Sequence, residues 1–323
     1  MWNNPVAMAR IHVLIAAVLF GTTGTAQALG PDLDPLAVGS ARIVVGAALL
    51  AVVALAAAGS AARAADPAGG RRALLGGVRA LLGAGDRRLI LLAGLFVAAY
   101  QASFFAAVAD TGVAVGTVVA LGSAPAFTGL FGRAFAGERL ERRWFAATGL
   151  ACVGVCLLTL GGGSGGDVSA PGIALALVAG AGYAGYAVIG KHLLDRGGMP
   201  EGVMAAVFGT GAIFLLPALA VTPTGELLSA DGLTLAVYLG VVTTALAYIL
   251  FAKGLRQIGA SETATLTLAE PVTAMALGFL VLGERPGAAA VAGAALVLAG
   301  LAVLALRFER RFGPAARPAE APA

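Results

Sequence analysis

Ten blocks of mostly apolar residues divide this chain, and no other feature restricts its possible folds as strongly. A helix needs about 20 such residues to cross the hydrocarbon core of a bilayer. Only 12% of the 323 residues are charged, whereas a soluble protein has about 25%. The sequence therefore predicts an all-α, polytopic membrane protein. Its ten transmembrane helices are expected at residues 11–30, 36–58, 89–109, 113–135, 144–160, 173–191, 203–221, 233–252, 260–282 and 288–306.

The positions of the basic residues predict how these helices are oriented. Cytoplasmic loops of membrane proteins are enriched in Lys and Arg. With the N-terminus in the cytoplasm, ten spans place all but two of the 21 Lys and Arg residues on that side. The exceptions are Arg285, in an outer loop, and Arg42, within or near the edge of the second span. We therefore expect a multi-pass protein of the cytoplasmic (inner) membrane with both termini in the cytoplasm.

An internal repeat is visible when the chain is aligned with itself at an offset of 146 residues. Three features then coincide: Pro125 with Pro271, the Gly-Glu-Arg triplet at 137–139 with that at 283–285, and Gly154 with Gly300. A single match between small residues would mean little. Three matches at one offset indicate a duplicated unit.

The repeat divides the chain into two halves of five predicted helices each. The first half covers 9–160, a Gly-rich linker covers 161–172, the second half covers 173–306, and a Pro- and Ala-rich tail at 307–323 is expected to be unstructured. Because five is odd, the second copy must enter the membrane from the opposite side. Inverted repeats of this kind are typical of secondary transporters.

These features together resemble a known family, the EamA-type branch of the drug/metabolite transporter superfamily. The resemblance rests on the five-helix halves, the Pro in the fourth helix of each half, the Gly-Glu pair that closes this helix, and the Gly-rich fifth helix. It covers residues 9–305 and is clearest at 260–300. It implies a ten-helix carrier of small polar or amphipathic metabolites, in many cases an exporter and in many cases coupled to protons.

Two helix-breaking prolines and one acid form the centre of the predicted site. A Pro within a helix removes one backbone hydrogen bond, so Pro125 and Pro271 are expected to free the carbonyl groups of Leu121 and Thr267. Such breaks line the substrate cavities of transporters, although each could be a simple packing kink. Glu270 lies midway along its span, where an ionised residue costs about 2.5–3.5 kcal/mol. It is therefore predicted to bind a proton or a cationic group, or else to form a purely structural hydrogen bond, for example to Ser123 or a Tyr.

Other polar residues of the spans are candidates for binding substrate. Arg42 could hold a carboxylate or phosphate through its planar group of donors, or could lie at the lipid interface. Each of the remaining candidates could equally serve as polar packing between helices; they are Gln27, Tyr100, Gln101, Tyr183, Tyr186 and Tyr248. Glu138 and Glu284 stand where one helix ends and the next begins, so a structural role at a helix N-terminus is expected for both.

The sequence argues against several classes of function. An enzyme within the membrane would need paired acids, a nucleophile with a base, or metal-binding His residues, but the predicted spans contain one mid-membrane acid and no mid-membrane His. No GxxxxGK[ST] loop is present, so ATP-driven transport is not indicated. We expect no cofactor, no metal and no nucleic acid. The predicted partners are a small-molecule substrate, the lipid bilayer and protons, with the protein a monomer or homodimer. A channel or facilitator for a small polar solute is the alternative.

Overall fold

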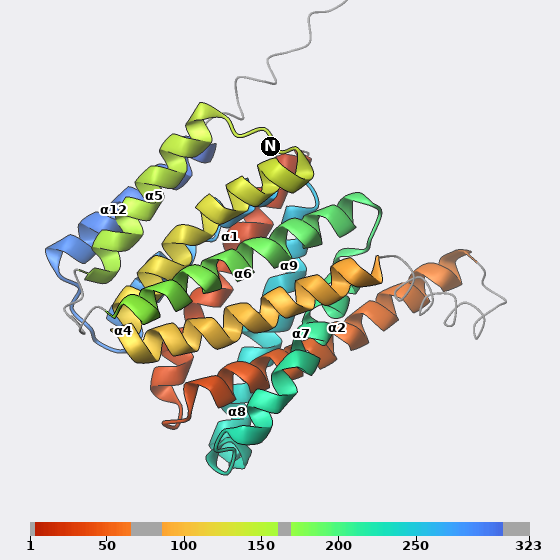
Figure 1. The fold of residues 1–323 in the computed structure, drawn as a ribbon, viewed down its shortest axis with the longest axis horizontal. Helices are drawn as coiled ribbons and strands as arrows, with labels where there is room; N and C mark the ends of the chain where they lie inside the picture. Colours follow the sequence, from red (N-terminus) through yellow and green to blue (C-terminus); the bar gives the residue numbers. More distant parts are fainter. Residues whose placement is uncertain (1–3, 66–85, 161–168, 306–323) are drawn as a thin grey trace, which may run out of the picture.

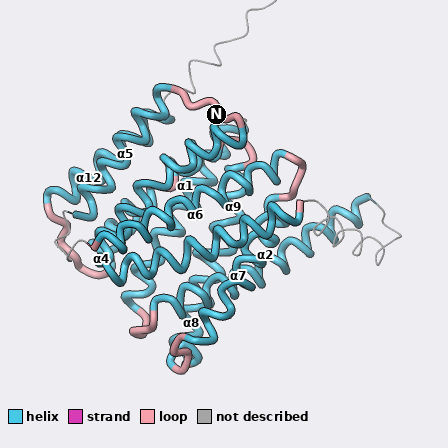
Figure 2. Tube along the Cα trace, viewed as in Figure 1, coloured by secondary structure: helices cyan, strands magenta, loops and turns pink. Residues whose placement is uncertain are grey.

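The structure, a computed structural model, describes residues 4–65, 86–160 and 169–305. All regular elements in these three ranges are helical, and the helices are joined by short loops (Figures 1 and 2). The long helices are α1 (Pro5–Leu29), α2 (Pro35–Ala65), α4 (Arg87–Ala136), α5 (Arg142–Leu160), α6 (Ala170–Asp195), α7 (Pro200–Val221) and α12 (Ala288–Ala305). The shorter elements are η1 (Glu226–Leu228), α8 (Ala230–Gly240), η2 (Val241–Leu246), α9 (Ala247–Leu255), α10 (Ala260–Leu266) and α11 (Ala269–Val281).

The number of membrane spans is smaller than expected in the part of the chain that the structure describes. Eight helical segments are long and apolar enough to cross a membrane: Pro5–Leu29, Pro35–Ala61, Arg87–Gly112, Val115–Ala136, Ala170–Asp195, Pro200–Val221, Ala230–Leu255 and Ala260–Val281. Helices α5 and α12 are not among them, and the apolar segment of α12, Ala288–Leu304, is shorter. The chain is thus a multi-pass helical membrane protein, but the count of ten spans is not confirmed.

Small residues let the helices approach one another closely. Helices α5 and α12 lie side by side at one edge of the molecule, and α4 packs along α6 (Figure 1). A Cβ atom added to Gly154 of α5 would lie 2.6 Å from the carbonyl oxygen of Gly293 in α12, which is closer than a real Cβ can come. Backbone thus meets backbone in this pair, as expected where lipid offers no hydrophobic drive for helix association.

Interruptions of the helices do not all lie where the prolines predict. Helix α4 joins the predicted third and fourth spans, with non-helical torsion angles at Gly112 (φ 80°), a conformation that glycine adopts readily. Pro125 lies inside this helix, which continues past it. The predicted eighth span contains the π-helical turn η2 at Val241–Leu246. The predicted ninth span is divided into α10 and α11 at residues 267–268, just before Pro271.

One backbone prediction for the ninth span is wrong. The carbonyl oxygen of Thr267, which Pro271 was expected to leave free, accepts a hydrogen bond of 2.9 Å from the backbone N–H of Glu270. A tighter turn has therefore replaced the bond that the proline removes. The helix is interrupted, but the backbone group at the interruption is satisfied, as a membrane interior requires.

The two Gly-Glu pairs have the same backbone geometry. Gly137 and Gly283 both adopt positive φ angles, 64° and 70°. The next residue in each case donates its N–H to a helix carbonyl, from Glu138 to Gly132 at 2.9 Å and from Glu284 to Gly278 at 3.0 Å. Each bond joins residues six positions apart and, together with the left-handed glycine before it, ends the helix. The pair at each position is thus a helix stop signal.

Two of the predicted regions fall largely outside the described residues. The tail at 307–323 lies outside them entirely, as do residues 161–168 of the linker. The linker's last residues are described. Ser169 caps α6 there, its Oγ accepting from the backbone N–H of Gly172 at 3.4 Å.

Candidate functional site

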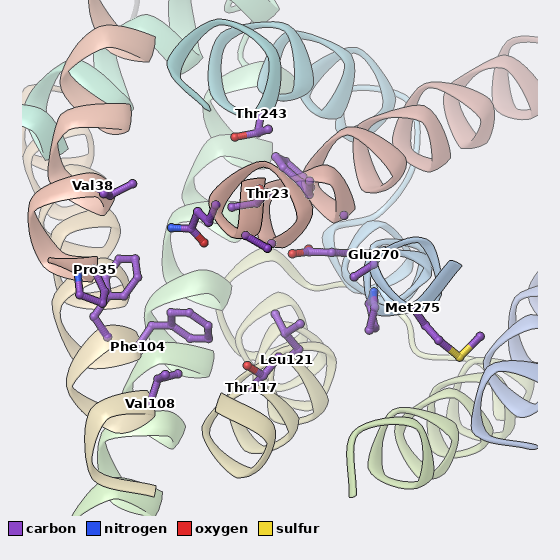
Figure 3. A pocket seen from close by; sticks show the side chains of 18 of the residues that line it. Thr23, Pro35, Val38, Phe104, Val108, Thr117, Leu121, Thr243, Glu270 and Met275 are labelled. Atoms are coloured by element: carbon purple, nitrogen blue, oxygen red, sulfur yellow. The ribbon is translucent and has the colours of Figure 1, made fainter. Parts of the chain in front are cut away.

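A cavity of about 1320 Å³ lies between residues of the two sequence halves. Helices α1, α2, α4 and α5 contribute to its walls from the first half, and α6, α8, η2, α9, α10, α11 and α12 from the second. Figure 3 shows Glu270 pointing into this space, with Thr23, Leu121 and Thr243 around it on other segments. Residues widely separated in sequence thus meet around one volume, large enough for a small metabolite.

The cavity reaches one end of the helix bundle and not the other. Its lining includes residues of the loops at 30–34 and 282–287, and this end is called the mouth. The opposite end carries the loops at 137–141, 196–199 and 256–259, none of which lines the cavity, and it is called the closed end. Within the described residues, the loops that line the cavity thus all belong to the mouth.

Six of the eight predicted binding residues line the cavity. They are Gln27, Arg42, Tyr100, Tyr183, Tyr248 and Glu270. The other two lie behind this surface, where Gln101 is 1% exposed and Tyr186 is 1% exposed. Tyr186 donates to or accepts from the hydroxyl of Tyr248 at 3.1 Å, so it supports a residue that faces the cavity.

Arg42 is held on the cavity wall by Gln101. The Nη2 atom of Arg42 donates to Oε1 of Gln101 at 2.9 Å, and Nε2 of Gln101 donates to the carbonyl oxygen of Gly39 at 3.1 Å. Of the two alternatives that the sequence left open, lipid interface or cavity, this geometry places Arg42 at the cavity.

Glu270 begins the second part of an interrupted helix and faces the same cavity. It lies in the first turn of α11, where the helix dipole favours a negative charge. Within the described residues, no hydrogen bond or ion pair to its carboxylate is found. The structural alternative, a hydrogen bond to Ser123 or to a Tyr, is not seen, since Ser123 bonds to the carbonyl of Ala120 instead.

Aromatic rings form a large part of the cavity wall, and the sequence predicts only some of them. Tyr183 bonds through its hydroxyl to Oγ1 of Thr267 at 3.1 Å, next to the interruption between α10 and α11. Phe20, Phe104 and Phe105 also line the cavity. Apolar residues are common throughout the spans, so nothing in the sequence distinguishes these three from residues that face lipid.

The N-terminus of α10 is tied to other helices at the closed end. Trp144 donates from Nε1 to the carbonyl oxygen of Ser261 at 3.1 Å. Glu138 accepts from the backbone N–H of Ser261 at 3.3 Å. Nε of Arg10 forms an ion pair with Oε1 of Glu262 at 2.6 Å. These contacts connect α10 with α1, with α5 and with the loop after α4.

Glu138 and Glu284, equivalent in the repeat, differ in their surroundings. Glu138 is half-buried and stabilises a helix N-terminus, as expected, although the helix is the distant α10 and not the adjacent α5. Glu284 is exposed at the mouth, and no such contact is found for it within the described residues. The contact with a helix N-terminus that was expected for Glu284 is therefore not found in this conformation, within the described residues.

Glu138 is predicted to make the stability of the closed end depend on pH. Burial raises the pKa of its carboxyl group, and the hydrogen bonds from Ser261 offset this only in part. The folded protein then holds a proton more tightly than the unfolded chain, whose glutamates titrate near about 4.3. Stability is therefore highest below this pH and falls as pH rises through the raised pKa. In thermal unfolding assays, Glu138→Gln should flatten this fall.

Glu284→Gln is the matched control for that experiment. It makes the same chemical change at the equivalent position of the second half, but on an exposed side chain. We expect its stability to follow the wild-type pH dependence. If Glu138→Gln also followed it, the buried carboxyl of Glu138 would not be its source.

Comparisons with known proteins agree with this arrangement. A family model described as the EamA-like transporter family matches the chain twice, at residues 8–160 and 170–306. The uncharacterized transporter YwfM of Bacillus subtilis (strain 168) is 38% identical over 295 residues, which are 91% of this chain and 92% of that protein. One solved crystal structure, whose description names no function, covers 95% of this chain and 99% of its own at a TM-score of 0.74 and 20% identity.

Two more distant relatives have names that state a substrate class. A probable amino-acid metabolite efflux pump of Salmonella typhimurium (strain LT2) is 29% identical and matches over 69% of this chain and 78% of its own. A probable terminal-alkyne amino-acid exporter of Streptantibioticus cattleyicolor is 30% identical over 60% of this chain and 65% of its own.

Proposed function

The chain belongs to the EamA-like transporter family, and we propose that it is a secondary transporter that exports small metabolites across the cytoplasmic membrane by alternating access. The observation that carries this proposal is the cavity, because residues of both sequence halves line it and, among the described loops, those that line it lie at one end of the bundle. A channel would need a continuous path to both ends. In the proposed topology ten helices form two inverted five-helix halves, both termini are cytoplasmic, and the mouth faces outward.

The contacts at the closed end support a specific account of how access to the cavity alternates between the two sides of the membrane. There the N-terminus of α10 is held by Glu138, Trp144 and Arg10. At the mouth, the equivalent Glu284 has no comparable contact within the described residues. We propose that opening toward the cytoplasm breaks the contacts of α10, while Glu284 takes up the N-terminus of the second part of α4, which follows Gly112. The two Gly-Glu pairs would thus close opposite ends in turn.

Glu270 is proposed to couple transport to protons. It lies in the cavity at mid-span, and no hydrogen bond or ion pair to its carboxylate is found within the described residues. A carboxylate in this position can hold either a proton or a cationic group of the substrate, but not both. Release of substrate outside and uptake of a proton would then be linked, which is the requirement for antiport. The names of two relatives support amino-acid-type metabolites as the substrates.

Transport into liposomes separates this proposal from the channel alternative. The purified protein is reconstituted, and uptake of a mixture of radiolabelled amino acids is measured with and without unlabelled amino acids inside. A carrier should show saturable uptake that internal substrate stimulates. Unsaturable flux without stimulation would favour a channel, and no flux of any tested metabolite above that of empty liposomes would contradict the proposal.

Pro271→Ala should slow turnover while substrate still binds. Alanine restores an N–H that can bond to the carbonyl of Thr267, in competition with the N–H of Glu270. The junction between α10 and α11 would then be closer to a continuous helix and harder to rearrange. We expect a fall in kcat with Kd nearly unchanged, measured by transport and by ligand-induced thermal shifts. Equal loss of both would indicate that Pro271 shapes the binding site itself.

A further inference from the structure

One buried N–H donor of the Arg42 guanidinium group has no hydrogen-bond acceptor in the structure. Nη2 is bonded to Gln101, but Nε is buried and has no hydrogen-bond partner. None of the ion pairs found within the described residues includes Arg42. A buried donor without a partner destabilises a protein, and a charged one does so more strongly. Arg42 lines the cavity next to Tyr100, so a ligand in the cavity could supply an acceptor to this group.

The support behind Arg42 fixes the orientation of this donor. Gln101 is 1% exposed, and its amide has a partner at each end, because Nε2 donates to Gly39 while Oε1 accepts from Arg42. A reversed amide would point its N–H groups at the donors of Arg42, so only one orientation satisfies both partners. Gly39 in turn lies against the ring of Phe105. The guanidinium group is thus positioned before any ligand binds, which lowers the cost of binding.

A second charge faces the same cavity from the other half of the chain. Glu270 lies near enough to Arg42 to interact with it electrostatically. The two are nevertheless not within ion-pair distance, since no ion pair joins them in the described structure. The cavity wall also includes aromatic side chains, among them Phe20, Tyr100 and Tyr248. A cation site and an anion site thus face one cavity without forming an ion pair with each other.

We infer that Arg42 binds a carboxylate group of the substrate while Glu270 receives its ammonium group, so that the cavity selects zwitterionic amino acids with an apolar body. This inference rests on the proposed transport function and narrows its substrate class. A carboxylate is the better match for the free Nε–H because it accepts charge-assisted hydrogen bonds in the plane of the guanidinium group. Lipophilic cations, which would leave Arg42 without an acceptor, should be excluded. Gln101 is the positioning residue of this site.

Matched sets of ligands test the requirement for the carboxylate. Thermal shifts of the purified protein are measured with leucine, leucinamide and 4-methylpentanoic acid, and with the corresponding sets for the other apolar and aromatic amino acids. Leucinamide keeps the ammonium group and loses the carboxylate; 4-methylpentanoic acid does the reverse. At least one amino acid should stabilise the protein, and its amide should bind at least about tenfold more weakly. Equal binding of amides, or no binding of any amino acid, would overturn the inference.

Three variants assign the effect to Arg42. Arg42→Gln should weaken binding of the amino acid at least about tenfold and leave binding of its amide unchanged. Gln101→Glu places a carboxylate beside the guanidinium group but loses the hydrogen bond to Gly39. Its unfolding temperature is therefore measured first, and binding of amino acids should be lost in the same way. Arg285→Gln removes an exposed charge that also lines the cavity and should bind amino acids like the wild type. An unaltered preference for carboxylates in Arg42→Gln and Gln101→Glu would contradict the assignment.

Transport measurements keep the two proposals separate. If the wild type transports amides or other cations in liposomes as well as it transports amino acids, the carrier function stands and the role of Arg42 falls. If no class of solute is transported at all, the proposed function itself is wrong.

Discussion

Replacing Glu270 with glutamine is expected to abolish proton-driven transport. Glutamine keeps the size and much of the hydrogen-bonding capacity of the side chain but cannot exchange a proton. The variant should still fold, because no hydrogen bond to the carboxylate of Glu270 is found within the described residues and the substitution therefore breaks none. In liposomes with a pH gradient, accumulation of substrate should fall to the equilibrium level, and the initial rate should no longer vary with pH.

Asp32→Asn provides the control for this experiment. Asp32 is also a carboxylate on the cavity lining, but it lies at the mouth and is exposed. This variant should keep gradient-driven accumulation. The role proposed for Glu270 would be wrong if Glu270→Gln transported at the wild-type rate with an unchanged pH profile.

A large loss of stability is expected from a larger side chain at Gly154. A Cβ atom there would lie 2.6 Å from both the carbonyl oxygen of Gly293 and the N atom of Val297. Both are backbone atoms, which cannot turn aside as a side chain can. Gly154→Val should therefore force α5 and α12 apart and lower the free energy of unfolding by about 3 kcal/mol or more, at the upper end of the effects of overpacking. Thermal unfolding in detergent measures the change.

Gly149→Val makes the same substitution on the same helix at a harmless position. Gly149 is exposed, and nothing lies within 4 Å of a Cβ atom added to it. Valine has a higher helix propensity than glycine, so this variant should be at least as stable as the wild type. Comparable loss in both variants would point to a general intolerance of α5 and not to contact with α12.

The sequence predicts the helices better than it predicts where they are interrupted. Blocks of apolar residues indicate a helix in a membrane almost regardless of tertiary contacts, because the backbone has no other way to satisfy its hydrogen bonds there. Interruptions depend on local torsion angles as well. Pro125 lies in a continuing helix, whereas Gly112 carries the non-helical angles of α4. The π-helical turn at Val241–Leu246 has no proline to announce it.

For the site, the types of residue were predictable but their partners were not. A charge within an apolar block identifies Glu270 and Arg42 without any structure, because burying a charge is costly. The hydrogen bond from Arg42 to Gln101 joins residues 59 positions apart, and the one from Ser261 to Glu138 joins residues 123 apart. No local pattern contains such a pairing. Which aromatic residues face the cavity, such as Phe104 rather than a neighbour, is likewise decided by how the helices are rotated in the bundle.

The single non-helical residue of α4 also bears on the mechanics of the molecule. Gly112 is a joint with two torsion angles between two rigid arms of a 50-residue helix. Both arms touch α6 backbone to backbone: a Cβ atom at Gly182 would lie 3.0 Å from the carbonyl oxygen of Phe96, and one at Gly180 would lie 2.9 Å from that of Ala120. Neither part of α4 can move relative to the other without displacing α6, so α6 restrains bending at Gly112. The interruption at 267–268 is crossed by α1 in a different way: a Cβ atom at Gly21 would lie 2.8 Å from the carbonyl oxygen of Glu270 in α11, whereas α10 is joined to α1 by the ion pair of Arg10 with Glu262. Backbone contact restrains one side of this interruption and a side-chain contact the other, so its two sides are held unequally.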